Sequence, residues 1–180
     1  MDYCNALYYG ISTSLMIKLQ RVQCCAARLV SKTKITARNM DKALMDLHWL
    51  KVKFRSIYKI CLITHNCLNQ KAPKPIISML NYGDSKRTLK LQETKYENRY
   101  GCRAFCHVAP KLWNLLPKNI REVKDTDRFK TLLKSFLMTR GEEYYTWIGR
   151  CWVFLSKETK TDGLIRMPPS SVPHSHCWVL

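Results

Sequence analysis

The sequence predicts a mainly α-helical fold: a small bundle of about five helices, with room for one short β-hairpin and a poorly ordered C-terminal tail. Apolar residues recur at intervals of three and four along several stretches, which is the spacing of one face of a helix. Prolines mark where several of these stretches begin and end. Strict apolar–polar alternation, which is typical of a half-buried strand, is weak.

The clearest helix is predicted from Arg128 to about Leu137. Its apolar stripe consists of Phe129, Leu132, Leu133, Phe136 and Leu137. Residues 125–127 (Asp-Thr-Asp) supply a possible N-cap and negative charge at its start. A shorter helix is predicted over residues 111–116. Pro110 suits its first turn because a proline lacks the N–H that would be unpaired there, and Pro117 ends it.

Three further helices are predicted toward the N-terminus. The first, capped by residues 12–14 and ending near Ser31, has a predicted buried side of Leu15, Leu19, Val22, Ala26, Leu29 and Val30. The second runs from about residue 39 to 48 and the third from about 52 to 69, and their continuity is left open. The buried side predicted for the third helix is Ile57, Ile60, Cys61, Thr64 and Leu68.

A brief helix over 76–80 can follow Pro75. Residues 87–92 and 103–108 are predicted to be extended, either as a small hairpin or lying along the helices. The predicted core consists of Leu19, Val22, Leu44, Leu47, Trp49, Ile60, Leu112, Trp113, Phe129, Leu132 and Phe136. Residues 1–140 are predicted to form one basic helical domain. Residues 141–180 are predicted to be an unrelated, largely disordered tail, with an apolar, aromatic part followed by a polar part containing three prolines.

The net charge of +18 is the most unusual property of the composition. Of the 31 basic and 13 acidic residues, four of each lie from Gly141 onward, so 27 basic and nine acidic residues lie before it. Such a domain should attract polyanions, with an affinity that falls as salt rises. The alternative is a solvated basic surface with no dedicated partner.

Nine cysteines do not predict a disulfide framework, because their number is odd and their spacing irregular. With no signal-peptide pattern at Met1, we expect an intracellular location, including the nucleus. The sequence contains no apolar run of about 18 residues, so it predicts no membrane partner. The sequence does not determine the oligomeric state.

The sequence predicts no metal, cofactor or catalytic residue. Cys102, Cys106 and His107, together with Cys61 and His65, could in principle supply zinc ligands, but a structural zinc site needs four ligands in tight pairs. Cysteine–histidine pairs also arise by chance in a chain this rich in cysteine. Glycines are dispersed rather than gathered in a phosphate-binding loop. Trp49 and Trp113 could stack on bases, although their apolar context favours core packing.

Several short motifs resemble one known family. They are Asp2–Gly10, Leu19–Gln23 and Ala26–Val30, then Leu47–Leu50, then Arg103–Phe105, Ala109–Asn114, Leu116–Pro117, Ile120–Arg121, Phe129–Lys130 and Leu133–Lys134. In order and spacing they resemble the region after the polymerase palm, including the thumb and beyond, of LINE reverse transcriptase polyproteins. These are non-LTR retrotransposons of the jockey and CR1 type. The resemblance covers roughly residues 2–138. Where this chain has Lys51, the family usually has a proline.

The resemblance implies a fragment without chemistry of its own. The family's metal-binding Asp-Asp pair belongs to the palm, and this chain has no such pair. We therefore expect the chain to begin inside an element, to be no enzyme, and at most to bind RNA or an RNA–DNA duplex electrostatically. The candidate phosphate contacts are Lys18, Arg21, Arg28, Lys32, Lys34, Arg38, Lys51, Lys53, Arg55, Lys59, Arg103 and Lys111. The alternatives are a translated remnant with no selected function and a helical protein-interaction module with exposed aromatic residues at Tyr8, Tyr9 and 144–152.

Overall fold

The computed structural model describes residues 3–31, 36–81, 89–94 and 101–156. Within these ranges the chain is mainly helical and contains no strand, so the predicted fold class is confirmed. The α-helices are α1 (Thr13–Ser31), α2 (Met40–Asp46), α3 (Val52–Leu68), α4 (Lys74–Ile77), α5 (Phe105–Asn114), α6 (Lys118–Arg121) and α7 (Thr126–Ser156). Short 3₁₀ turns precede α1, α2 and α5 at Asn5–Tyr8, Ala37–Asn39 and Gly101–Arg103. The predicted tail beyond residue 156 lies outside the described residues.

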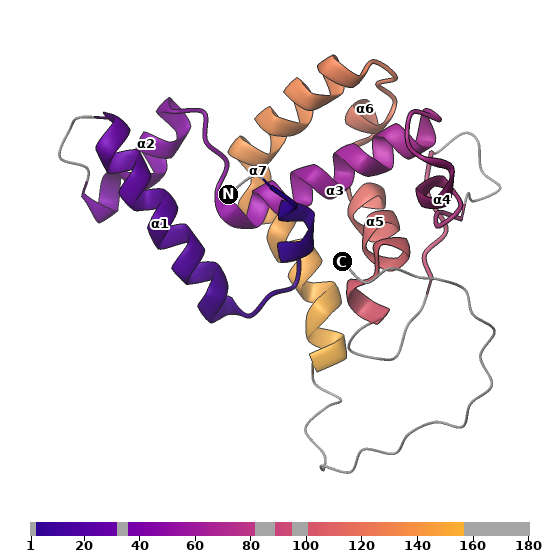
Figure 1. The fold of residues 1–180 in the computed structure, drawn as a ribbon, viewed down its shortest axis with the longest axis horizontal. Helices are drawn as coiled ribbons and strands as arrows, with labels where there is room; N and C mark the ends of the chain where they lie inside the picture. The colour runs from indigo at the N-terminus through magenta and orange to yellow at the C-terminus, as the bar shows by residue number, and fades with distance from the viewer. Residues whose placement is uncertain (1–2, 32–35, 82–88, 95–100, 157–180) are drawn as a thin grey trace, which may run out of the picture.

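Helix α3 is the centre of the fold and contacts α1, α4, α5, α7 and the turn Asn5–Tyr8. Figure 1 shows α5 beside it and the long helix α7 crossing it, with α1 and α2 (indigo to purple) standing apart as an arm. The buried side predicted for α3 is confirmed at four of its five positions, with Leu68 only half-buried. Two apolar clusters result: a large main core around α3, α5 and α7, and a small one of Ala27, Met40 and Leu44 between α1 and α2.

Helices α2 and α3 are separate although no proline divides them. His48 adopts a left-handed backbone conformation with φ 53°, and the Trp49 N–H donates to the Leu44 carbonyl at 2.8 Å. Such a residue ends a helix by turning the chain away while its last carbonyls stay paired. Leu50 and Lys51 then lead in extended form to Val52, where α3 begins.

The start of α5 differs from the prediction. It begins at Phe105, so Pro110 lies inside the helix, and residues 105–108, which were predicted to be extended, are helical. A proline within a helix leaves one carbonyl without its N–H donor, here that of Cys106. The Thr94 hydroxyl donates to this carbonyl at 3.3 Å, and His107 Nδ1 lies 2.5 Å from the Thr94 carbonyl. Contacts from outside the helix thus compensate for the proline.

Residues 89–94 lie along α5 as a strap, the second of the two arrangements that the sequence left open. The Asn114 side chain accepts from the Leu91 N–H and donates to the Leu91 carbonyl, both at 2.9 Å, as a neighbouring strand would. The Trp113 indole donates to the Leu89 carbonyl at 2.7 Å. The predicted hairpin is wrong because side chains of α5, rather than a second strand, satisfy this backbone.

The largest corrections concern α7. Its N-cap is confirmed, since the Asp125 carboxylate accepts from the Arg128 N–H at 2.8 Å. The helix then continues through the predicted domain boundary at residue 140 and on to Ser156, so that boundary is wrong. Tyr144, with 1% of its surface exposed, and Ile148 belong to the main core, and the predicted exposed aromatic patch at 144–152 is therefore wrong at these positions. Leu132, predicted to be buried, is exposed, while Phe129, Leu133 and Leu137 are fully buried.

Helix α1 also differs from the prediction, in which of its sides is buried. The side predicted to be buried carries Leu15, Val22, Leu29 and Val30, and all four are exposed. Gln23 and Ala27 face inward in their place. The spacing of apolar residues correctly predicted a helix, but the apolar side is not the side that meets the rest of this chain.

Candidate nucleic-acid interface

The predicted basic residues lie on several different elements of the structure. Lys18, Arg21 and Arg28 are exposed on α1, and Arg38 is exposed on the turn before α2. Lys51, Lys53, Arg55 and Lys59 lie just before and along the first half of α3. Arg103 and Lys111 are half-buried at and within α5. Lys32 and Lys34 lie outside the described residues.

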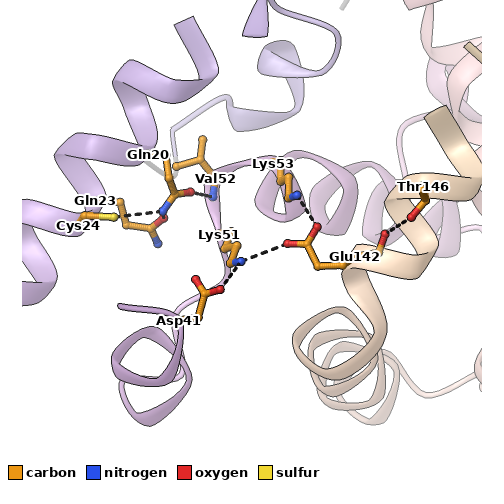
Figure 2. A network of polar contacts seen from close by, with 9 residues as sticks. All are labelled: Gln20, Gln23, Cys24, Asp41, Lys51, Val52, Lys53, Glu142 and Thr146. Atoms are coloured by element: carbon orange, nitrogen blue, oxygen red, sulfur yellow. Dashed lines mark hydrogen bonds and ion pairs between the residues drawn. The ribbon is translucent and has the colours of Figure 1, made fainter. Parts of the chain in front are cut away.

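Lys51 and Lys53 share one carboxylate, that of Glu142, and Lys51 also pairs with Asp41. Glu142 of α7 lies 3.1 Å from Lys51 Nζ and 2.6 Å from Lys53 Nζ, and Asp41 lies 3.0 Å from Lys51 Nζ (Figure 2). Burial alone would raise the pKa of Glu142, but the hydrogen bonds and charges of the two lysines outweigh it and lower this pKa. These two lysines hold α7 against α3, which leaves them less charge to offer a phosphate.

Lys53 also lies over two aromatic rings. Its Nζ is 5.0 Å from the centroid of the Phe54 ring and 4.7 Å from that of Tyr145. Both distances are within the range of a cation–π interaction. Lys53 is therefore a structural residue at the α3–α7 contact.

A groove of about 350 Å³ lies beside α3 and has basic side chains in its lining. It is lined by Asn5, His48, Trp49, Leu50, Arg55, Tyr58, Lys59 and Lys134. Arg55 and Lys59 are one turn apart on α3, and Lys134 comes from α7. Among the described residues that line this groove, three are basic and none is acidic, which favours an anionic ligand there.

The walls of the groove combine charge with aromatic surface. Trp49 packs partly against the small α1–α2 cluster and also borders the groove. The Arg55 Nε–H donates to the Leu50 carbonyl at 2.9 Å, which fixes the guanidinium beside the groove. Tyr58 is half-buried, and burial raises the pKa of its phenol despite the nearby Lys130 charge, so it stays neutral. Cations beside aromatic rings form the combination that binds phosphates and bases of single strands.

Asn5 adds a buried polar group to this groove. The residue is 7% exposed, and its side-chain oxygen has no hydrogen-bond partner within the part of the chain that the structure describes. A buried acceptor without a donor costs stability unless a ligand or water pairs with it. The Asn5 side-chain oxygen is thus an unpaired, buried acceptor on a residue that borders the groove.

The residues considered for zinc serve structural roles. No group of three or more histidine, cysteine or acidic side chains within the described ranges could hold a metal ion. His65 Nε2 donates to the Val123 carbonyl at 2.8 Å, and its ring stacks on Phe129 with centroids 4.1 Å apart. Burial raises the pKa of the Cys61 thiol to about 12, so this thiol stays protonated and unreactive as a nucleophile at neutral pH.

Comparison with known proteins adds no family. No protein-family model, curated protein or solved structure matches the chain. Among the described helices, none combines the length and apolar character needed to cross a membrane.

Sequence reasoning identified only part of the groove. Arg55 and Lys59 were candidates because of their charge, and their i,i+4 spacing places them on one side of α3. Lys134 and Asn5 were missed, because only the packing of α7 and the Asn5–Tyr8 turn on α3 brings them to the groove. Tyr58, which lies on α3, and His48, which lies just before it, were missed as well. Arg103 and Lys111 do not line the groove.

Proposed function

We propose that this chain is a non-catalytic fragment of a LINE-type RNA-directed DNA polymerase that binds RNA or an RNA–DNA duplex electrostatically. The observation that carries the proposal is the groove whose described lining residues include Arg55, Lys59 and Lys134. Further support comes from the net charge of +18 and from the resemblance of residues 2–138 to the family. Phosphate contacts require cations along a surface rather than a strict motif.

The exposure and pairing of the lysines indicate which of them would contact phosphate. Lys59 is exposed and Lys134 half-exposed at the groove, whereas Lys51 and Lys53 are paired with Glu142. Trp49 and Tyr58 would add stacking on unpaired bases. We therefore expect RNA with single-stranded segments to bind at least as well as a duplex of equal length.

The test is a filter-binding titration of the full chain with a single-stranded RNA and an RNA–DNA duplex at several salt concentrations. The Lys59→Gln/Lys134→Gln variant removes two groove cations. The matched control is Lys74→Gln/Lys124→Gln, which removes two exposed lysines of α4 and the link before α7. Each phosphate contact contributes about 0.7–0.9 to the slope of log affinity against log salt. The groove variant should therefore lose about 1.4–1.8 units of slope, and the control much less.

Two results would contradict the proposal. Affinity that is equal at low and high salt would remove the electrostatic argument altogether. An equal loss in the two double variants would mean that overall charge, and not the groove, attracts the nucleic acid. Metal-dependent primer extension by the purified chain would separately refute its being non-catalytic.

A further inference from the structure

Helix α1 has its polarity reversed relative to the rest of the molecule. Leu15 is 50% exposed, Val22 59%, Leu29 82% and Val30 55%. A surface helix normally turns its apolar side inward and its polar side to water. A contiguous exposed apolar strip of this kind marks a site where another molecule docks.

The inner side of α1 is held by hydrogen bonds of glutamine side chains. Gln23 Nε2 donates to the Leu50 carbonyl at 2.7 Å. The Val52 N–H donates to Gln20 Oε1 at 3.0 Å, as Figure 2 shows. Gln20 Nε2 in turn donates to Gln23 Oε1 at 3.0 Å. These bonds satisfy the backbone where α3 begins, so they fix which side of α1 faces the protein. The apolar side is thereby held outward.

The apolar strip has the spacing of a helix-pairing surface. Leu15, Leu19, Val22, Ala26 and Leu29 follow one another at intervals of four, three, four and three residues. This alternation defines the contact positions of a coiled coil. The helix has 19 residues, or roughly 28 Å at 1.5 Å per residue, which allows a partner helix of about five turns to lie alongside.

The charges beside the apolar strip determine which kind of partner helix is favoured. Lys18 adjoins the strip, and Arg21 and Arg28 lie further round on the same side. Helix α1 contains no acidic residue. A second copy of α1 would bring cations against the same side of this strip, which is unfavourable in a helix pair, whereas acidic flanking residues would be attracted.

We propose that the outer face of α1 docks an amphipathic helix of another protein, with an apolar heptad strip flanked by acidic residues. Lys18, Arg21 and Arg28 then serve protein recognition and select the acidic partner, instead of contacting phosphate. This docking face is independent of the groove on α3 and α7, because none of its residues lines that groove. It goes beyond nucleic-acid binding by giving the chain a second partner.

The test uses the full chain and a synthetic helical peptide of three heptads, with leucine at the contact positions and glutamate at the flanking ones. One comparison peptide carries lysine in place of glutamate, and another has the acidic composition in scrambled order. The chain variants are Leu29→Ser and Val22→Ser/Leu29→Ser, with Leu132→Ser as the control at an exposed leucine of α7. Fluorescence anisotropy measures binding, and circular dichroism shows that each variant keeps its helices.

The acidic heptad peptide should bind at least about tenfold more tightly than either comparison peptide, since both apolar burial and charge must match. The double serine variant should weaken this binding by about tenfold or more, and Leu132→Ser should leave it unchanged. RNA binding should be the same in all three variants, which separates this inference from the proposed function. Equal binding of the acidic and scrambled peptides would overturn it, because overall charge would then suffice.

Three other results would also overturn the proposal. Equal binding of the lysine peptide would show that the cations do not select the partner. A dimer in sedimentation velocity that the double serine variant disperses would identify a second copy as the occupant. Binding to phosphatidylserine vesicles that depends on Val22 and Leu29, with no binding of the acidic peptide, would identify a lipid surface.

Discussion

Gly141→Ala tests the contact between α7 and α3 at the point where the sequence predicted a domain boundary. A Cβ at this position would lie 3.0 Å from Cε2 and Cζ of Phe54 and 3.2 Å from its Cε1. Separations this short force the ring to move. The Phe54 side chain is buried, with Tyr145 edge-on at 6.4 Å between centroids and Lys53 over its face, so the ring has little freedom to move.

Two effects of opposite sign compete in this substitution. Alanine within a helix is favoured over glycine by about 1 kcal/mol. Inserting a methyl group into a packed site costs about 1–3 kcal/mol. The net expectation for Gly141→Ala is a loss of up to about 2 kcal/mol, although the site lies in a helix where alanine alone would stabilise. A chain of this size loses about 2–4 °C of melting temperature per kcal/mol.

Phe54→Leu provides the control, because it removes the ring edge that the new methyl group would meet. In this background Gly141→Ala should stabilise by about 1 kcal/mol, the helix term alone. The effect of one substitution thus changes sign with the other, which gives a coupling energy of about 1–3 kcal/mol in a double-mutant cycle. Thermal and urea unfolding followed by circular dichroism at 222 nm measures all four proteins.

The reasoning fails if Gly141→Ala raises the melting temperature equally in both backgrounds, since the methyl group would then meet no ring. If Gly141→Ala has no effect on stability in either background, residue 141 does not lie in a helix packed on α3. That result would agree with the tail that the sequence predicted from residue 141 onward. A cooperative transition in the parent chain would also favour a self-sufficient domain over an orphaned remnant.

Three further predictions concern the strap, pH and thiol reactivity. Asn114→Ala removes both hydrogen bonds to Leu91 and should cost about 1–3 kcal/mol in urea unfolding, whereas Asn114→Gln, if it restores them, should cost less. Burial lowers the pKa of His65 although its backbone hydrogen bond opposes this. The unfolded chain therefore binds more protons below about pH 6.5, so stability should fall as pH drops from 7 to 5.5, with a flatter dependence in His65→Asn. Brief iodoacetamide treatment at pH 8 followed by mass spectrometry should label the exposed Cys25 and leave Cys61, whose pKa is about 12, unmodified until the chain unfolds.

The helices that surround the core could be predicted because each has one apolar side that meets the main core. Phe129, Leu133 and Leu137 recur on α7, and Ile57, Ile60 and Cys61 recur on α3. Periodicity of this kind fixes both the helix and its buried side when the partner belongs to the same chain. The same rule failed at α1, because periodicity predicts which side of a helix is apolar but not which molecule covers that side.

The proline rule failed at α5 for a local reason. A proline in a helix is unfavourable on average, but the Thr94 hydroxyl reaches the carbonyl that Pro110 leaves without its helical donor. Thr94 lies 16 positions earlier in the sequence, and no local pattern connects the two. The groove was incomplete in the sequence for a similar reason, since Lys134 joins Arg55 and Lys59 only after α7 has packed on α3.

Because the two apolar clusters are separate, the molecule has two units that should differ in their free energy of local unfolding. The α1–α2 arm has a small cluster of its own, and its described ties to the rest of the protein include glutamine hydrogen bonds and the Lys51 ion pair with Asp41. Amide protons of the arm should exchange with solvent through partial opening, well before those of the α3–α5–α7 body. Salt screens an exposed ion pair but barely affects buried hydrocarbon. Raising the ionic strength should therefore loosen the arm while the body stays closed.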